Sequence, residues 1–145
     1  AHELGHIAAL RALGARLDGL SMDIFGLRLD YSGSLTKRRE LVCAAAGPGA
    51  GLIYAGVCLA LGSSFAAASG TMSLLLTGFN LLPALPLDGG RMVLAALGRA
   101  AARRASRITS LGLFAAGLGL LFALDEPAAL FPGTWLLLCS LRAGT

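Results

Sequence analysis

The segment His2-Glu3-Leu4-Gly5-His6 carries the side chains best suited to chemistry. Its two histidines are four residues apart, so on a helix both imidazoles project from one face and could bind the same metal ion. Histidine nitrogen is a common ligand of zinc, and Glu3 beside it could act as a general base. Packing or capping is the weaker explanation, because the chain's two histidines both belong to this motif. The spacing predicts one zinc ion per chain.

A third ligand must come from elsewhere, because a catalytic zinc ion has three protein ligands and an open position for water. Of the acidic residues outside the motif, four lie in or near a predicted hairpin and two lie at the far end of a predicted span. Asp88, in Pro86-Leu87-Asp88-Gly89-Gly90, is the one left. An Asp-Gly-Gly sequence alone indicates a turn. However, Asp88 ends an uncharged run, where an ionisable side chain is costly and usually functional. We therefore predict that it is the third ligand.

Asn80 is the other polar side chain that stands out in this uncharged run. Two interpretations stay open: a hydrogen bond between helices, which is common for Asn in membranes, or a contact that holds a substrate carbonyl. Gly47, Pro48, Gly49 and Gly51 form a second cluster, and small residues at this spacing most simply allow close contact between helices.

The composition indicates a membrane protein. Of the 145 residues, 56% are apolar and 14% are charged, whereas about a quarter are charged in a typical soluble domain. The formal net charge is +4, but the basic residues form short clusters without interleaved aromatic residues, which excludes nucleic acid as a partner. The cysteines, Cys43, Cys58 and Cys139, stand singly in apolar surroundings and are interpreted as packing residues.

The first part of the chain is predicted to form a helix over residues 1–14 and a short β-hairpin over residues 16–36. Gly14 would end the helix. In the hairpin, the β-forming residues include Ile24 and Tyr31, and Asp18-Gly19 and Ser32-Gly33 are turn signals. A motif of this kind normally lies inside a longer helix, so we expect that the sequence lacks an N-terminal part with some of a first membrane helix.

The rest of the chain is predicted to be mainly membrane helix. Residues 41–61 carry no charge, and at 1.5 Å per residue they match the roughly 30 Å hydrocarbon core of a bilayer. The further predicted elements are a broken span over 69–87, interrupted by Pro83 and Pro86, a basic amphipathic segment over 91–107, a span over 108–124 and a short span over 128–141. The fold class is therefore mainly α: one polytopic helical bundle over residues 1–145, with the hairpin between the motif helix and the next span.

The charges predict the orientation of these spans. If the spans alternate, all twelve Lys and Arg residues fall on one side, while Asp125 and Glu126 fall on the other. Cytoplasmic loops collect Lys and Arg, so the basic side is the cytoplasmic one. His6 is ten residues from Arg16 and Asp88 is three residues from Arg91. The sequence thus predicts an integral, multi-pass protein with its site nearer the cytoplasmic face.

Three segments taken in order resemble the site-2 protease family of intramembrane zinc metalloproteases. They are the His2–His6 motif, Ala46-Gly47-Pro48, and Phe79-Asn80-Leu81-Leu82-Pro83-Ala84-Leu85-Pro86-Leu87-Asp88-Gly89-Gly90-Arg91. The resemblance covers residues 2–91. It implies that His2, His6 and Asp88 bind zinc, that Glu3 is the catalytic base and that Asn80 contacts the substrate or the transition state.

Within that family the chain is most similar to the compact bacterial members, among them the sporulation protease that releases a sigma factor from its membrane-bound precursor. A bacterial cell membrane is therefore the expected location. A likeness in fold does not supply a substrate, so the sporulation role is not carried over.

The predicted function is that of a zinc-dependent endopeptidase that cleaves a single-span or membrane-associated protein in the lipid bilayer, with a regulatory membrane protein as a further candidate partner. One alternative is a catalytically silent membrane protein that binds zinc or client helices, against which Glu3 argues. Another is a metal transporter, which would need polar positions in several spans. The hairpin could offer a strand edge to an extended substrate or could simply cover the site.

Overall fold

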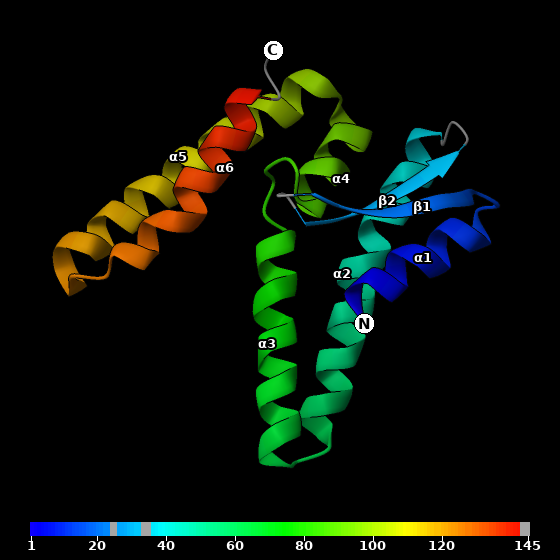
Figure 1. The fold of residues 1–145 in the computed structure, drawn as a ribbon, viewed down its shortest axis with the longest axis horizontal. Coiled ribbons are helices and arrows are strands. Elements are labelled where there is room, and N and C mark those ends of the chain that lie inside the picture. The colour runs from blue at the N-terminus through cyan, green and yellow to red at the C-terminus, as the bar shows by residue number, and fades with distance from the viewer. Residues whose placement is uncertain (24–25, 33–35, 143–145) are drawn as a thin grey trace. The chain divides into compact units, whose positions relative to one another are not determined.

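The computed structural model describes residues 1–23, 26–32 and 36–142, and most of them are helical. The chain packs as two units, Ala1–Leu81 and Leu82–Thr145. Figure 1 shows the elements of the first unit in blue to green and those of the second in green to red.

The first unit begins with α1, His2–Ala12, which carries both histidines. Gly14, with φ of +74°, ends it as predicted. The backbone N–H of Gly14 donates to the Arg11 carbonyl and that of Ala15 donates to the Leu10 carbonyl, which is the paired pattern of a Schellman cap. Glycine is favoured at this position because a side chain is strained at such a φ.

Two antiparallel strands follow, β1 (Arg16–Asp23) and β2 (Gly26–Ser32), in the region where the sequence predicts a hairpin. The Asp18-Gly19 pair differs from the prediction, because it lies inside β1 at a register irregularity instead of forming a turn. An extra residue can be accommodated at such a bulge without ending the strand. Ile24, Gly33 and the other residues of 24–25 and 33–35 lie outside the described residues.

Helix α2, Lys37–Ala60, starts four residues before the predicted span, where the Thr36 side chain accepts a hydrogen bond from the Arg39 backbone at 3.4 Å. Its buried residues are all small, and they recur at helical spacing along one face: Cys43, Ala44, Gly47, Pro48, Gly51, Ala55 and Cys58. This face lets α1 and α3 pack closely against α2, and Figure 1 shows α3 running antiparallel beside it.

The predicted glycine contacts are present at two positions of α2. A side chain at Gly47 would overlap the His6 ring, and one at Gly51 would overlap the Thr77 hydroxyl of α3. Gly49 differs from the prediction, since nothing lies within 4 Å of the position its side chain would take. Polar contacts also join α2 to α3: the Ser73 hydroxyl donates to the Gly51 carbonyl at 3.0 Å.

Helix α3, Ser64–Asn80, ends before both prolines of the predicted broken span. The span is therefore one helix followed by a loop, because proline has no N–H to continue the hydrogen-bond ladder and its ring restricts the residue before it. In the second unit, the loop backbone is held where the Leu85 N–H donates to the Ser106 hydroxyl at 2.9 Å.

The second unit contains α4 (Asp88–Leu97), α5 (Arg99–Leu124), the short 3-10 helix η1 (Pro127–Ala129) and α6 (Leu130–Arg142). Gly98, with φ of 86° and ψ of 177°, separates α4 from α5 in a conformation that is essentially restricted to glycine. It divides the predicted basic segment, so most of that segment begins α5 instead of standing apart. A side chain at Gly117 would overlap the Ala129 carbonyl of η1, and one at Gly133 would overlap the backbone of Phe114 in α5. These glycines therefore allow the close packing of α5 with η1 and α6 that Figure 1 shows.

Two described helices, α2 and α5, are long and apolar enough to cross a membrane. Large apolar side chains are also exposed along both helices and along α3, including Ile53, Val57, Phe65, Leu75, Ile108 and Phe122. Such exposure is costly in water and favourable against lipid.

Candidate metal centre

The two histidines of α1 face each other as their spacing predicts. Their Nε2 atoms are 3.2 Å apart, and their rings meet edge to face with centroids 4.9 Å apart. One turn of helix is sufficient to bring them together, since residues i and i+4 lie one above the other. His6 is buried and His2 is half-buried, so the pair lies at the edge of the packed interior of the first unit.

The His6 ring is oriented by α2. Its Nδ1 atom lies 2.8 Å from the backbone carbonyl of Cys43. A carbonyl oxygen can only accept, so Nδ1 carries the proton, and in the neutral imidazole Nε2 is then unprotonated and can accept. The Nε2 lone pair is directed at His2, whose Nε2 donates to it. Metal-binding histidines commonly have this arrangement, with the second ring nitrogen donating to a carbonyl.

The close approach of α1 to α2 depends on Gly5. A side chain there would overlap the Ala46 carbonyl oxygen and would crowd the Ala50 methyl group. Small residues on both helices therefore place the motif directly against α2, within reach of the Cys43 carbonyl.

Glu3 lies between the two histidines in the first turn of α1 and is half-buried. It therefore lies on the helix that carries both histidines. A carboxylate at this position is accessible enough to exchange protons with water.

Asp88 is the first residue of α4 in the second unit, and it is only 6% exposed. Its Oδ1 lies 3.7 Å from Nη1 of Arg91, one turn further along the helix. A buried carboxylate is stable when it is paired or when it binds a metal ion. A side chain at Gly90 would overlap the backbone of Ala84 and Leu85, so this glycine allows the start of α4 to pack on the preceding loop.

Asn80 is the last residue of α3 and is half-buried. Its side-chain nitrogen donates to the Leu76 carbonyl of the same helix at 3.0 Å. This hydrogen bond lies within α3, so it is not the contact between helices that the sequence suggests, and it uses one of the two donors of the amide.

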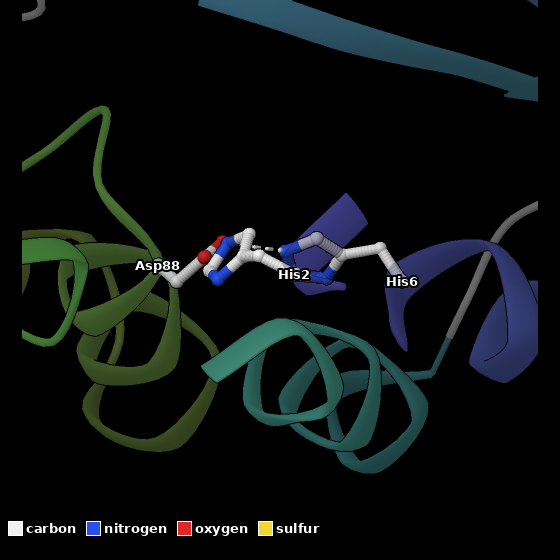
Figure 2. Close-up of side chains that lie close together, drawn as sticks. All are labelled: His2, His6 and Asp88. Atoms are coloured by element: carbon white, nitrogen blue, oxygen red, sulfur yellow. Dashed lines mark hydrogen bonds between the residues drawn. The ribbon is translucent and has the colours of Figure 1, made fainter. Parts of the chain in front are cut away.

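Figure 2 draws His2, His6 and Asp88, the group within the described part of the chain whose side chains could hold a metal ion. Two imidazole nitrogens and one carboxylate oxygen match the ligand set of catalytic zinc sites, which leave a further position open. The lone pair that His6 directs away from Cys43 also fits this use. The donor chemistry of these residues therefore fits zinc.

Two groups that the motifs do not identify position these elements. The Cys43 carbonyl orients the His6 ring, and the Ser106 hydroxyl holds the loop that precedes α4. The first is a backbone group, so no side-chain pattern could reveal it. The second lies in the basic segment, and a serine among arginines and alanines gives only a weak signal.

Comparison with known proteins identifies the same family as the motifs. Residues 60–124, which include Asn80 and Asp88, match the model of peptidase family M50. Rip3 of Mycobacterium tuberculosis, a candidate zinc metalloprotease by its name, is 33% identical over 158 residues in each of two strains. The match covers 94% of this chain, and the chain spans 39% of the length of these relatives.

The fold is also that of a solved protein. The site-2 protease of Methanocaldococcus jannaschii matches with a TM-score of 0.69 and 24% sequence identity, over 99% of this chain and 72% of that one. The match to the family model and the Rip3 relatives agree with the ordered motifs in pointing to peptidase family M50, the site-2 protease family, and the chain has the fold of a solved site-2 protease.

Proposed function

We propose that this chain is the catalytic core of a zinc-dependent intramembrane endopeptidase. His2, His6 and Asp88 hold one zinc ion, and Glu3 is the general base. The substrate is a single-span or membrane-associated protein, cleaved at a peptide bond within or beside the bilayer.

The observation that carries this proposal is the orientation of the His6 ring. The Cys43 carbonyl accepts a hydrogen bond from Nδ1–H of His6, so the Nε2 lone pair is directed at the second histidine, 3.2 Å from its Nε2. Two imidazoles held for packing alone would not need converging ring nitrogens. Converging nitrogens with one ring fixed by a carbonyl are what a zinc site requires.

Asp88 supports the same function as the oxygen ligand. It is buried at the start of α4, and the free-energy cost of burying a charged carboxylate is offset by partners of opposite charge. Its exposed neighbour Arg91 is one such partner, and the zinc ion is proposed as the other. A bound zinc ion would supply Lewis acidity toward the scissile carbonyl and would lower the pKa of water.

Glu3 then moves the proton. Its carboxylate takes a proton from the attacking water and delivers it to the leaving amine, so that peptide hydrolysis needs no covalent bond to the enzyme. Asn80, with a second amide donor beyond its bond to Leu76, is proposed to contact the substrate carbonyl.

The bilayer is the proposed setting. The apolar helices α2 and α5 support it, as do the exposed apolar side chains along α3. Multi-pass insertion would place the basic ends of the helices, and the metal centre with them, toward the cytoplasm. A regulatory membrane protein is the further partner proposed for this setting.

The test compares the full-length protein with its Glu3→Gln variant on a library of tagged single-span substrates, with zinc measured in both. Gln keeps the size of Glu but cannot take a proton, so cleavage should fall by about 100-fold or more while zinc is retained. Equal cleavage by the two proteins would contradict the mechanism. Zinc binding by both proteins without cleavage of any substrate would instead support the silent zinc-binding protein.

A further inference from the structure

Gly47 of α2 lies against the ligand atom of His6. A side chain at Gly47 would overlap the Nε2 atom of the ring and crowd Cε1 and Cδ2. Gly47 is buried, and it follows Cys43 by one helical turn on the same face of α2. The His6 ring is thus bounded by two groups of one helix, the Cys43 carbonyl at Nδ1 and the bare Cα of Gly47 beside Nε2.

From this arrangement we infer that Gly47 is a positioning residue for zinc binding: its missing side chain leaves the space in which the His6 Nε2 lone pair can reach a metal ion, while the Cys43 carbonyl fixes the proton on Nδ1. The inference rests on the proposed zinc site. It goes further by assigning the tautomer and orientation of one ligand to α2, a helix that supplies no ligand itself.

Close helix packing is the alternative role for Gly47. The contacts of Gly5 and Gly51 distinguish this role from the positioning of His6. The approach of α1 to α2 is set by Gly5, whose side chain would overlap the Ala46 carbonyl of α2. The approach of α3 to α2 is set by Gly51, whose side chain would overlap the Thr77 hydroxyl. At Gly47 the neighbouring atoms are those of the imidazole ring, so the space serves the ring.

Gly47, Gly49 and Gly51 therefore form a matched set on one helix. The first lies against the ligand ring, the second has nothing within 4 Å and the third lies against α3. An alanine at each position adds the same methyl group and the same helix propensity. Differences among the three variants then report only what the methyl group meets.

The experiment measures zinc affinity in the full-length protein by competition with a chromophoric chelator, together with the thermal unfolding of the metal-free form. Gly47→Ala should weaken zinc binding by about 10- to 100-fold, the range seen when groups that orient ligands are changed. It should also alter the visible spectrum of the cobalt-substituted protein. Gly49→Ala should leave both properties unchanged, and Gly51→Ala should lower the unfolding temperature without weakening zinc binding.

Wild-type zinc affinity in Gly47→Ala would overturn the inference, as would an equal loss of affinity in Gly51→Ala. A His6→Ala variant distinguishes the failure of this inference from that of the proposed function. If His6→Ala binds zinc as well as the parent does, the zinc site itself is wrong. If only His6→Ala loses zinc, the zinc site stands and the role of Gly47 is wrong.

A measurement on the unmodified protein covers the case in which Gly47→Ala does not fold. In NMR of isotope-labelled histidine in the metal-free full-length protein, the His6 signal can be assigned by its loss from the His6→Ala spectrum. The protonated nitrogen of His6 should be Nδ1 and its Nε2 should be unprotonated. A proton on Nε2 instead would overturn the inference.

Discussion

At the residue scale, the sequence predicts what depends on local geometry. The pairing of His2 with His6 follows from a four-residue spacing on one helix, and the structure has it. The hydrogen bond from His6 to the Cys43 carbonyl joins positions that are 37 residues apart. No spacing rule reaches that far, so the packing of α1 on α2 had to be known first. Asp88 is predicted to be a ligand because an ionisable side chain is costly in an uncharged run, and this role stays a prediction.

The role of Asp88 can be tested with a matched pair of substitutions. Asp88→Asn keeps the size of the side chain but removes the charged ligand, so zinc affinity should fall by more than about 100-fold, beyond the loss typical of groups that only orient ligands. Arg91→Gln removes its partly exposed partner at 3.7 Å, and it should change zinc affinity little, because such pairs contribute only about 1 kcal/mol or less. Chelator competition measures both, and unchanged affinity in Asp88→Asn would rule out the carboxylate as a ligand.

At the scale of elements, helix ends were predictable where one residue decides them. Gly14 ends α1 because its positive φ suits glycine. The two prolines predict an interruption of the span over 69–87, but α3 already ends at Asn80, before both of them. The sequence does not predict the break at Gly98, because a single glycine between helix-forming residues is often tolerated inside a helix. The sequence of Asp18-Gly19 has the composition of a turn, and only the pairing of β1 with β2 shows that it lies within a strand.

The hairpin gives a prediction at this scale. In a sheet of two strands, β1 and β2 each have one edge that pairs with no other described strand, and an extended substrate could add there. Replacing residues 16–32 by a Gly-Ser linker of equal length in the full-length protein should then reduce cleavage of a tagged single-span substrate at least tenfold, with zinc content unchanged. If the hairpin only covers the site, cleavage should stay the same or rise.

At the scale of the whole molecule, the composition indicates that lipid surrounds much of the protein. A chain with 14% charged residues cannot cover its surface with charge, and its helices α2, α3 and α5 expose bulky apolar side chains. The division into two units at Leu81 was not predictable, because it depends on which helices pack together. Hydrophobic runs indicate the spans but not their neighbours.

The proposed orientation can be tested by thiol labelling in intact cells. Position 126, tested as Glu126→Cys, lies just beyond the C-terminal end of α5, and position 104, tested as Arg104→Cys, lies near its arginine-rich beginning. Because Lys and Arg collect on the cytoplasmic side, a membrane-impermeant reagent should label position 126 in intact cells but position 104 only after lysis. The unsubstituted chain gives the background, since its three cysteines are buried. The reverse labelling pattern would invert the proposed topology.

The two sides of α2 face different constraints on their amino acids. On the inner side, where Cys43, Gly47 and Gly51 lie, the close packing limits each side chain to a few atoms. On the outer side, where Ile53 and Val57 are exposed, any apolar residue of any size would serve against lipid. In a family alignment this helix should therefore look variable when scored by identity, yet show a constant helical rhythm when scored by side-chain volume.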